Sequence, residues 1–332
     1  MLVITRTPIR ISFLGGGTDY AEFFEPHGGG EVLAASIDKY CYLKVNTLHD
    51  FFEYRLRVSY RKTELLQSID EVQHPSVREC LKFMKAELPL EIHYMGDLPA
   101  RTGLGSSSAF TVGLLHALHA YKSEVVSAER LAREANEVEH NWIKERVGYQ
   151  DQCMAAYGGI KHINFIDKDE INVQPVPLNK NRLKELRSNL MIFYTGITRF
   201  AHEILEEQME KTINNSNTDS LIKMRGLVGE GIKILTDNNR NLSEFGELLH
   251  EGWEIKKGLS NSISNPEISI AYDKAVNAGA VGGKLLGAGG GGFLLFVVPP
   301  EKQNAVREAL IPMKELTFDF APLGSQVIFY HE

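Results

Sequence analysis

One segment combines glycines and serines at a spacing that suits phosphate binding. It runs from Pro99 to Ala109, contains Gly103-Leu104-Gly105-Ser106-Ser107-Ser108, and lies between a predicted strand and a predicted helix. Glycines let a backbone turn tightly and approach a ligand closely. Free N–H groups at a helix start, together with the helix dipole, attract anions. One serine would be enough to cap the helix, so three serines favour a phosphate-binding loop over a simple capped turn.

Two familiar nucleotide motifs do not fit this loop. A Walker A motif requires Gly-Lys-Ser or Gly-Lys-Thr after four intervening residues, and no lysine follows Gly105. The dinucleotide fingerprint requires a third glycine where this chain has Ser108. A literal Gly-x-Gly-x-x-Gly does run from Gly287 to Gly292, but a predicted strand follows it where the fingerprint requires a helix. A dehydrogenase is therefore a distant alternative.

Two further glycine clusters could lie against a ligand. From Pro8 to Tyr20, a predicted strand carries Arg10 and leads into a glycine loop with Asp19. A carboxylate there could accept hydrogen bonds from sugar hydroxyls, although Asp19 taken alone fits a turn or helix cap better. From Gly287 to Gly292 the side chains are almost absent, so a nucleotide or another backbone can approach. A close-packed turn explains that second cluster equally well.

Two carboxylates lie on neighbouring predicted helices. Glu139 belongs to a helix expected from Ser127 to Val147, and Asp151 begins a short helix expected from Gln150 to Tyr157. A helix start favours the ionised carboxylate, which suits a group that accepts a proton from a substrate hydroxyl or orients it. Glu139 could hold a magnesium ion, which prefers oxygen ligands. Without the glycine motifs, a helix cap and a solvated helix face would be the better explanations.

The elements that position these residues mix strands and helices in both halves of the chain. That mixture predicts an α+β fold rather than a doubly wound parallel sheet. We expect a boundary near residues 175–189, which gives one domain over 1–185 and a second over 186–332. Strands are expected near 9–13, 40–45, 54–60, 90–94, 190–195, 280–286, 292–298 and 325–330, and further helices near 199–214, 218–237, 241–260, 266–278 and 301–311.

Bulk properties narrow the class of protein. The chain has 332 residues, which favours two domains. Its net charge of -7 argues against a nucleic-acid binder. Three widely spaced cysteines indicate a reducing compartment and no zinc site. No apolar run is long enough to span a membrane. We therefore expect a cytoplasmic protein with no membrane partner, and the sequence leaves open whether it is a monomer or a homodimer.

The three glycine clusters, in this order, resemble those of the GHMP kinase superfamily, named for galactokinase, homoserine, mevalonate and phosphomevalonate kinases. The resemblance runs along nearly the whole chain. It implies an N-terminal α+β domain and a ferredoxin-like C-terminal domain, with the active site between them. It also implies a set of roles: ATP binding by Gly103, Leu104, Gly105, Ser106, Ser107 and Ser108; Mg²⁺ binding by Ser107 and Glu139; catalysis by Asp151 with Arg10 beside it; and sugar binding by Asp19.

One departure bears on the substrate. Galactokinases carry Glu-His before Thr-Asp, whereas this chain has Gly16-Gly17 before Thr18-Asp19. The absence of the Glu and His side chains argues against galactose as the substrate and leaves room for a larger sugar. The segments 15–20, 148–152 and 195–199 look more like bacterial D-glycero-α-D-manno-heptose 7-phosphate kinases. Those enzymes phosphorylate the anomeric C1 hydroxyl, giving the 1,7-bisphosphate on the route to GDP-heptose.

The resemblance then implies a substrate site with a basic residue for the 7-phosphate. Arg199 and Lys284 are the candidates, and a surface salt bridge explains Arg199 as well. The full expected substrate set is Gly16, Gly17, Thr18, Asp19, Arg199, Lys284, Gly289 and Gly290. Two alternatives stay open: another sugar 1-kinase, acting on fucose or a related unphosphorylated sugar, and a sugar and ATP sensor without turnover. The presence of Ser107, Glu139 and Asp151 argues against the sensor.

Overall fold

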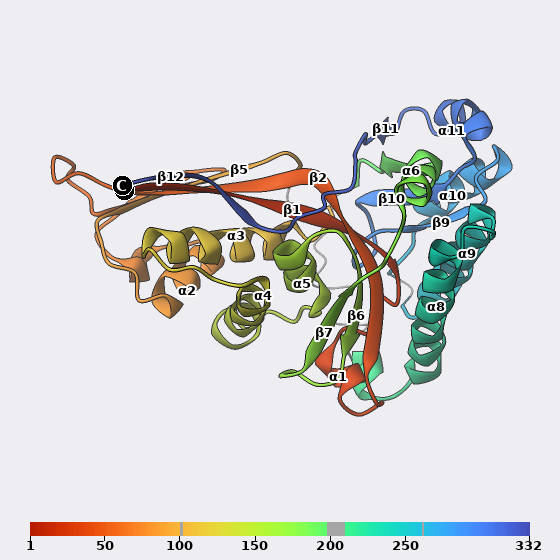
Figure 1. Ribbon diagram of the computed structural model, residues 1–332, viewed down its shortest axis with the longest axis horizontal. Coiled ribbons are helices and arrows are strands. Elements are labelled where there is room, and N and C mark those ends of the chain that lie inside the picture. The colour runs from red at the N-terminus through yellow and green to blue at the C-terminus, as the bar shows by residue number, and fades with distance from the viewer. Residues whose placement is uncertain (100–101, 198–209, 261) are drawn as a thin grey trace.

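The protein is an elongated α+β molecule built on two β-sheets (Figure 1). The computed structural model describes residues 1–99, 102–197, 210–260 and 262–332. The predicted α+β class is confirmed. The strands are β1 (Leu2–Leu14), β2 (Gly30–Thr47), β3 (Leu56–Ser59), β4 (Thr63–Leu66), β5 (Leu90–Gly96), β6 (Ile160–Phe165), β7 (Ile171–Pro175), β8 (Leu190–Tyr194), β9 (Gly282–Leu285), β10 (Phe293–Val297), β11 (Lys314–Glu315) and β12 (Gln326–His331).

The described residues also form helices between these strands, among them two short 3₁₀ turns and one π-helix. The α-helices are α1 (Ala21–Phe24), α2 (Pro75–Phe83), α3 (Ser106–Tyr121), α4 (Ala128–Glu137), α5 (Gln150–Tyr157), α6 (Lys180–Asn189), α8 (Thr218–Thr236), α9 (Leu242–Lys257), α10 (Pro266–Asn277) and α11 (Gln303–Ala309). The 3₁₀ turns are η1 (Ile69–Glu71) and η3 (Pro300–Lys302), and the π-helix is η2 (Val138–Ile143).

The first sheet is dominated by the long strands β1 and β2. Its order among the described residues is β12-β1-β2-β5-β3-β4, and β6 pairs with β2 and with β7. Helices α2, α3, α4 and α5 cover one face of this sheet (Figure 1). Because helix and sheet each bury one apolar side, the pairing encloses a hydrophobic core between them.

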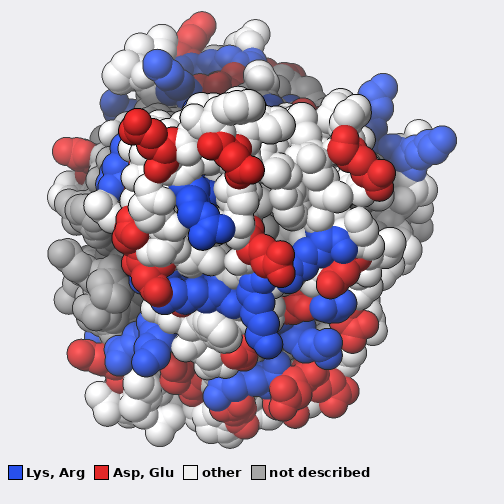
Figure 2. Space-filling model, turned by 90° about the vertical axis from the view of Figure 1, so that its left-hand side faces the viewer, with Lys and Arg blue, Asp and Glu red and all other residues white. Residues whose placement is uncertain are grey.

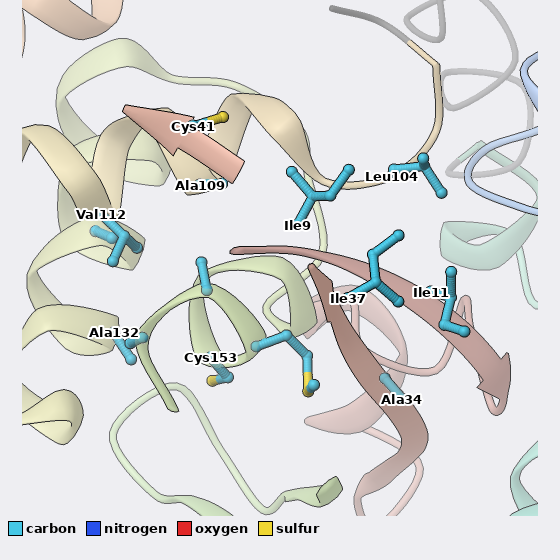
Figure 3. Packing of buried hydrophobic residues seen from close by; sticks show 14 of the residues in the cluster. Ile9, Ile11, Ala34, Ile37, Cys41, Leu104, Ala109, Val112, Ala132 and Cys153 are labelled. Atoms are coloured by element: carbon cyan, nitrogen blue, oxygen red, sulfur yellow. The ribbon is translucent and has the colours of Figure 1, made fainter. Parts of the chain in front are cut away.

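That core lies directly behind the phosphate-binding segment predicted from the sequence. Figure 3 shows Ile9 and Ile11 of β1 and Ile37 of β2 in one cluster with Leu104 and Val112. Leu104 is fully buried. The loop around Gly103 and Gly105 is therefore anchored to the sheet by its own leucine, which fixes where α3 begins.

The second sheet has the strand order β11-β8-β10-β9. Numbered along this half, the order is 4-1-3-2, and every pair is antiparallel. That order is the one expected for the predicted ferredoxin-like arrangement. Helices α8 and α9 lie side by side against this part of the molecule (Figure 1). A second hydrophobic cluster, which includes Phe193, Trp253 and Phe296, fills the interior.

The end of the chain returns to the first sheet. Strand β12 pairs antiparallel with β1, from Leu2 opposite His331 to Arg6 opposite Gln326. The predicted division between residues 185 and 186 falls within α6. The boundaries 1–185 and 186–332 stay a prediction, and the last strand lies in the sheet of the first half.

One predicted helix is longer than the observed one. Ser127 caps α4 as expected, by accepting a hydrogen bond from the Arg130 N–H. The helix does not run to Val147, because it passes into the π-helix η2 and ends where Lys144 adopts a left-handed φ of 63°. The imidazole of His140 lies within hydrogen-bond distance of the carbonyls of Asn136 and Val147, so the following segment folds back instead of continuing the helix.

The surface does not concentrate one sign of charge on the face drawn in Figure 2. Lys and Arg side chains lie among Asp and Glu side chains there. Within the described ranges, no helix has the length and apolar character needed to cross a membrane.

Candidate active site

The predicted catalytic residues Asp151 and Arg10 form a bidentate ion pair. Arg10 Nε donates to Asp151 Oδ1 and Arg10 Nη2 donates to Oδ2, each at 2.7 Å. Arg10 comes from the buried strand β1 and Asp151 from the first turn of α5. Such paired bonds fix the plane of the carboxylate as well as its charge. The structure therefore brings together two residues that are 141 positions apart in the sequence.

The predicted phosphate-binding loop packs against this pair. Arg10 Nη1 donates to the carbonyl of Gly103 at 2.7 Å, and the Arg10 N–H donates to the carbonyl of Leu104. Gly105 has a φ of +73°, and a Cβ there would lie 3.1 Å from Asp151 Oδ2. Glycine is thus required both by the turn and by the close approach of the carboxylate. The start of α3, with its free N–H groups, faces the same site as Asp151.

Asp19 is buried beside these residues. Its side chain is held by the Gly17 N–H and by Gln150 Nε2, both at 2.9 Å, and Gln150 directly precedes Asp151. Burial is the main cause that raises the pKa of Asp19, with a further contribution from the charge of Asp151. Gly148 packs so closely on this carboxylate that a Cβ there would lie 1.9 Å from Oδ2. The structure therefore joins Asp19 and Asp151 in one site.

Thr18, Gly16 and Gly17 differ in what they offer a substrate. Thr18 is fully buried, and its hydroxyl donates within the loop, to the carbonyls of Gly15 and Glu31. These hydrogen bonds of Thr18 hold the loop in its shape. Gly16 and Gly17 are partly exposed and present backbone only. A substrate role for these three residues stays a prediction.

Glu139 is buried behind the start of α3. It accepts hydrogen bonds from Ser108 Oγ at 2.9 Å and from the amide of Gln152. Burial raises the pKa of Glu139 to about 7, although the hydroxyls of Thr111 and Ser108 and the Gln152 amide oppose the rise. The structure pairs Glu139 with Ser108, while Ser107 is exposed on the same helical turn.

The residues at this place fit a magnesium ion. Magnesium is usually held by one or two protein oxygens, with phosphate oxygens and water completing its shell. Oε1 of Glu139 is buried and has no hydrogen-bond partner among the described residues. A buried carboxylate oxygen without a partner is costly unless a cation or donor reaches it. Ser107 and Glu139 as ligands stay a prediction that this donor set supports.

The third glycine cluster contacts the first half of the chain. A Cβ on Gly287 would lie 2.4 Å from the Cα of Gly103. Gly289 packs against Ile263, and the Gly290 N–H donates to the Ile263 carbonyl at 2.9 Å. The cluster is thus a close-packed turn that also borders the phosphate loop. A substrate role for Gly289 and Gly290 stays a prediction.

Two lysines bear on this site, and sequence reasoning identified only one of them. Lys284 is buried, and its Nζ donates to the carbonyl of Phe13 at 2.8 Å. Lys256, at the end of α9, is also buried and donates to the carbonyl of Gly287. Lys256 continues the apolar stripe of α9 through Leu249 and Trp253, a placement that could have marked it as buried. Arg199, the other predicted phosphate ligand, lies outside the described residues.

A large cavity lies elsewhere in the described part of the chain. It has a volume of about 730 Å³ and lies between α1, α4, the segment 144–149 and β7. Its walls include Glu137, His140, Arg146 and Tyr149. Because Arg10, Asp19 and Asp151 are not among its lining residues, we do not assign the chemistry to it.

Comparisons with known proteins agree with this geometry. The family model for the GHMP kinases N terminal domain matches residues 75–159, and that for the GHMP kinases C terminal matches residues 233–312. A D-glycero-alpha-D-manno-heptose 7-phosphate kinase of Campylobacter jejuni is 28% identical over 332 residues, covering 96% of this chain and 95% of the relative. A galactokinase of Pyrococcus furiosus is 22% identical, and the match covers 93% of this chain and 92% of the relative.

Solved structures share the fold. A D-glycero-D-manno-heptose 1-phosphate kinase from Bacteroides thetaiotaomicron superposes with a TM-score of 0.79, 24% identity and complete coverage of both chains. The galactokinase of Lactococcus lactis, complexed with galactose, has a TM-score of 0.75 and 20% identity, covering 98% of this chain and 95% of that one. The predicted two-domain kinase fold is confirmed.

Proposed function

The chain belongs to the GHMP kinases, and we propose that it phosphorylates the anomeric C1 hydroxyl of D-glycero-α-D-manno-heptose 7-phosphate. The product would be the 1,7-bisphosphate. At the coarser level, the chain is a sugar kinase of this family, a phosphotransferase that takes its phosphoryl group from ATP and delivers it to a hydroxyl. The alternative within the same chemistry is a kinase for an unphosphorylated sugar such as fucose, for which related kinases also exist.

One observation carries the choice of substrate. The loop that presents Asp19 has glycine at positions 16 and 17, so its open side is bare backbone, and the buried Lys284 is bonded to Phe13 just before that loop. A sugar that extends beyond six carbons and ends in a phosphate fits this combination of space and positive charge. The similarity to the Campylobacter jejuni kinase along almost the whole chain supports the same choice.

The arrangement supports in-line phosphoryl transfer. Asp151 accepts the proton of the C1 hydroxyl or orients that hydroxyl. The hydroxyl oxygen then bonds to the γ-phosphorus of ATP while the bond from that phosphorus to the bridging oxygen breaks, which releases ADP. Arg10 holds the Asp151 carboxylate in place through two hydrogen bonds. The N–H groups at the start of α3 bind phosphate oxygens.

Glu139 and Ser107 would hold Mg²⁺ at this site. Bound there, the ion supplies positive charge to the phosphate oxygens, which phosphoryl transfer requires. Gln152 keeps the carboxylate of Glu139 directed toward α3. Asp19, fixed by Gln150, accepts hydrogen bonds from sugar hydroxyls next to the reacting one.

The test is ADP release over a panel of sugars. The panel contains heptose 7-phosphate, the same heptose without phosphate, fucose and galactose, each with ATP and Mg²⁺. We expect the highest kcat/KM with heptose 7-phosphate. Turnover confined to the unphosphorylated sugars would reject the substrate assignment, and turnover with none of them would reject the sugar-kinase role altogether.

A further inference from the structure

Two lysines from the second half of the chain are buried near the proposed substrate loop. Lys256 lies in the last turn of α9 and Lys284 in β9, and they are 7% and 5% exposed. Buried lysines are uncommon because removing an ammonium group from water is costly. Two of them, on separate elements and near one another, are a costly feature that core packing does not require.

Neither lysine has a charged partner among the residues that the structure describes. Lys284 donates to the Phe13 carbonyl at 2.8 Å and Lys256 to the Gly287 carbonyl. Backbone carbonyls accept these hydrogen bonds but do not neutralise the charge. Burial lowers the pKa of Lys256 to about 8 and lowers that of Lys284 well below its usual value, and each is lowered further by neighbouring positive charge.

The surrounding charges leave a positive excess. Arg10 and Asp19 both act on the two lysines through their charges. Arg10 is already committed to Asp151. Among the described residues, Asp19 is the acid whose charge acts on both lysines, so the ammonium forms of Lys256 and Lys284 would together face one carboxylate. A dianionic group brought by a ligand would reverse this imbalance.

The position of Lys284 favours the sugar over the nucleotide as the source of that group. Its contact, Phe13, comes just before the Gly15-Gly16-Gly17 loop that leads to Asp19. The proposed function instead places the phosphates of ATP at the start of α3, where a helix N-terminus offers backbone N–H groups. Lys284 therefore lies on the side of the site that would meet the sugar, and Lys256 is near enough for its charge to act on Lys284.

We propose that Lys256 and Lys284 form the site that binds the phosphate group of a phosphorylated sugar and that selects such sugars over unphosphorylated ones. The inference rests on the proposed function and assigns it two residues. A bound phosphate stabilises the ammonium form of both lysines. Binding of the sugar phosphate is therefore coupled to proton uptake by the protein, whereas binding of the same sugar without phosphate is not.

The experiment compares four proteins: wild type, Lys256→Met, Lys284→Met and the control Lys257→Met. Methionine keeps the buried volume and removes the charge. Lys257 is the next residue on α9, and its Nζ pairs with Glu254 at the surface. For each protein, kcat/KM is measured with heptose 7-phosphate and with the unphosphorylated heptose, and the KM for ATP is measured as well. Thermal unfolding verifies that each variant is folded.

We expect Lys256→Met and Lys284→Met to lose at least about tenfold more kcat/KM on the phosphorylated sugar than on its unphosphorylated counterpart, as for a lost hydrogen bond to a charged group. Lys257→Met should keep the wild-type ratio of kcat/KM between the phosphorylated and the unphosphorylated sugar. Equal losses on both sugars, or a change confined to the KM for ATP, would overturn the lysine site while leaving the proposed function intact. A wild type that turns over only unphosphorylated sugars would overturn both.

A second measurement does not depend on turnover. Titration calorimetry of heptose 7-phosphate into wild-type protein, in two buffers of different ionisation enthalpy at pH 8, reports the protons exchanged on binding. We expect net proton uptake in wild type and a smaller uptake in Lys256→Met and in Lys284→Met. The same uptake in all three proteins would contradict the assignment.

Discussion

Asp151 is the residue on which the proposed chemistry depends most directly. Its carboxylate is oriented by Arg10, borders Gly105 and lies beside the buried Asp19. As a carboxylate in the first turn of α5 it would also stabilise that helix. The catalytic and the capping interpretations predict different behaviour when the charge is removed.

Asp151→Asn should lower kcat by roughly 10² to 10⁴, the usual contribution of a positioned acid or base, while ATP still binds. The check is kcat from ADP release together with the ATP dissociation constant. Asp219→Asn is the control, because Asp219 is an exposed acid in the first turn of α8. A kcat near that of wild type would show that Asp151 only stabilises α5.

Glu139 leads to a prediction about stability and pH. Burial raises its pKa from 4.5 to about 7. Between these values the folded protein keeps a proton that the unfolded chain has released, so the contribution of Glu139 to stability decreases as the pH rises from about 4.5 to 7. Gln cannot titrate. The free energy of unfolding of wild type should therefore fall relative to Glu139→Gln across this window, by at most about 3 kcal/mol.

Denaturant unfolding at several pH values, in buffer without divalent metal, measures this difference. Glu129→Gln is the matched control, because Glu129 is an exposed acid in the first turn of α4. Curves of wild type and Glu139→Gln that stay parallel from pH 4 to 8 would show that burial does not shift the carboxyl in the folded protein.

At the scale of elements, the turn that starts α3 sets the geometry of the site. Gly105 adopts a left-handed φ of +73° and leaves no room for a side chain against Asp151 and Arg10. Gly105→Ala should destabilise the protein by roughly 1–2 kcal/mol and lower kcat, because the new methyl group displaces the carboxylate.

The comparison for that prediction is Gly226→Ala. Gly226 lies in α8, and a Cβ added there would meet no neighbouring group of the described residues within 4 Å. Alanine there should stabilise the helix by up to about 1 kcal/mol without affecting turnover. Melting temperature and kcat of both variants are the measurements. If Gly105→Ala behaved like Gly226→Ala, the close packing of the loop on Asp151 would be wrong.

Local signals predict many elements well. The helix expected from Gln150 to Tyr157 is confirmed to its ends, because Gly158 stops it with a φ of +66°. The helix expected to reach Val147 ends at Ile143, because a lysine takes a left-handed conformation there and His140 bonds the returning segment. Side-chain periodicity cannot predict such an ending, since it depends on contacts made after the turn.

The site is also predictable only in part, because some of its residues are buried by contacts with segments far away in the sequence. Arg10, Asp19, Glu139 and Asp151 follow from motifs, and the structure brings Arg10, Asp19 and Asp151 together. Sequence reasoning misses Lys256 because a lysine in the last turn of a helix usually lies in solvent beside the last carbonyls, and its place on the apolar stripe of α9 is a weak signal by comparison. Its burial depends on the packing of α9 against the third glycine cluster, far away in the sequence.

At the scale of the whole molecule, the site is built where the two sheets' loops meet. Gly103, before α3, lies against Gly287, after β9, and Lys284 reaches back to Phe13 in β1. In the proposed site, the first half supplies the phosphate loop and the carboxylates, and the second half supplies the lysines. The strand β12 then forms the edge of the first sheet beside β1 (Figure 1).

The central claim is that this assembly transfers phosphate to C1 of a sugar that already carries a phosphate. Phosphorus NMR of a reaction with ATP, Mg²⁺ and D-glycero-α-D-manno-heptose 7-phosphate tests it most directly. We predict one new sugar-phosphate signal per ADP formed, coupled to the anomeric proton, while the 7-phosphate signal is retained. A new phosphate on any other carbon, or ADP formed without a new sugar phosphate, would contradict the account.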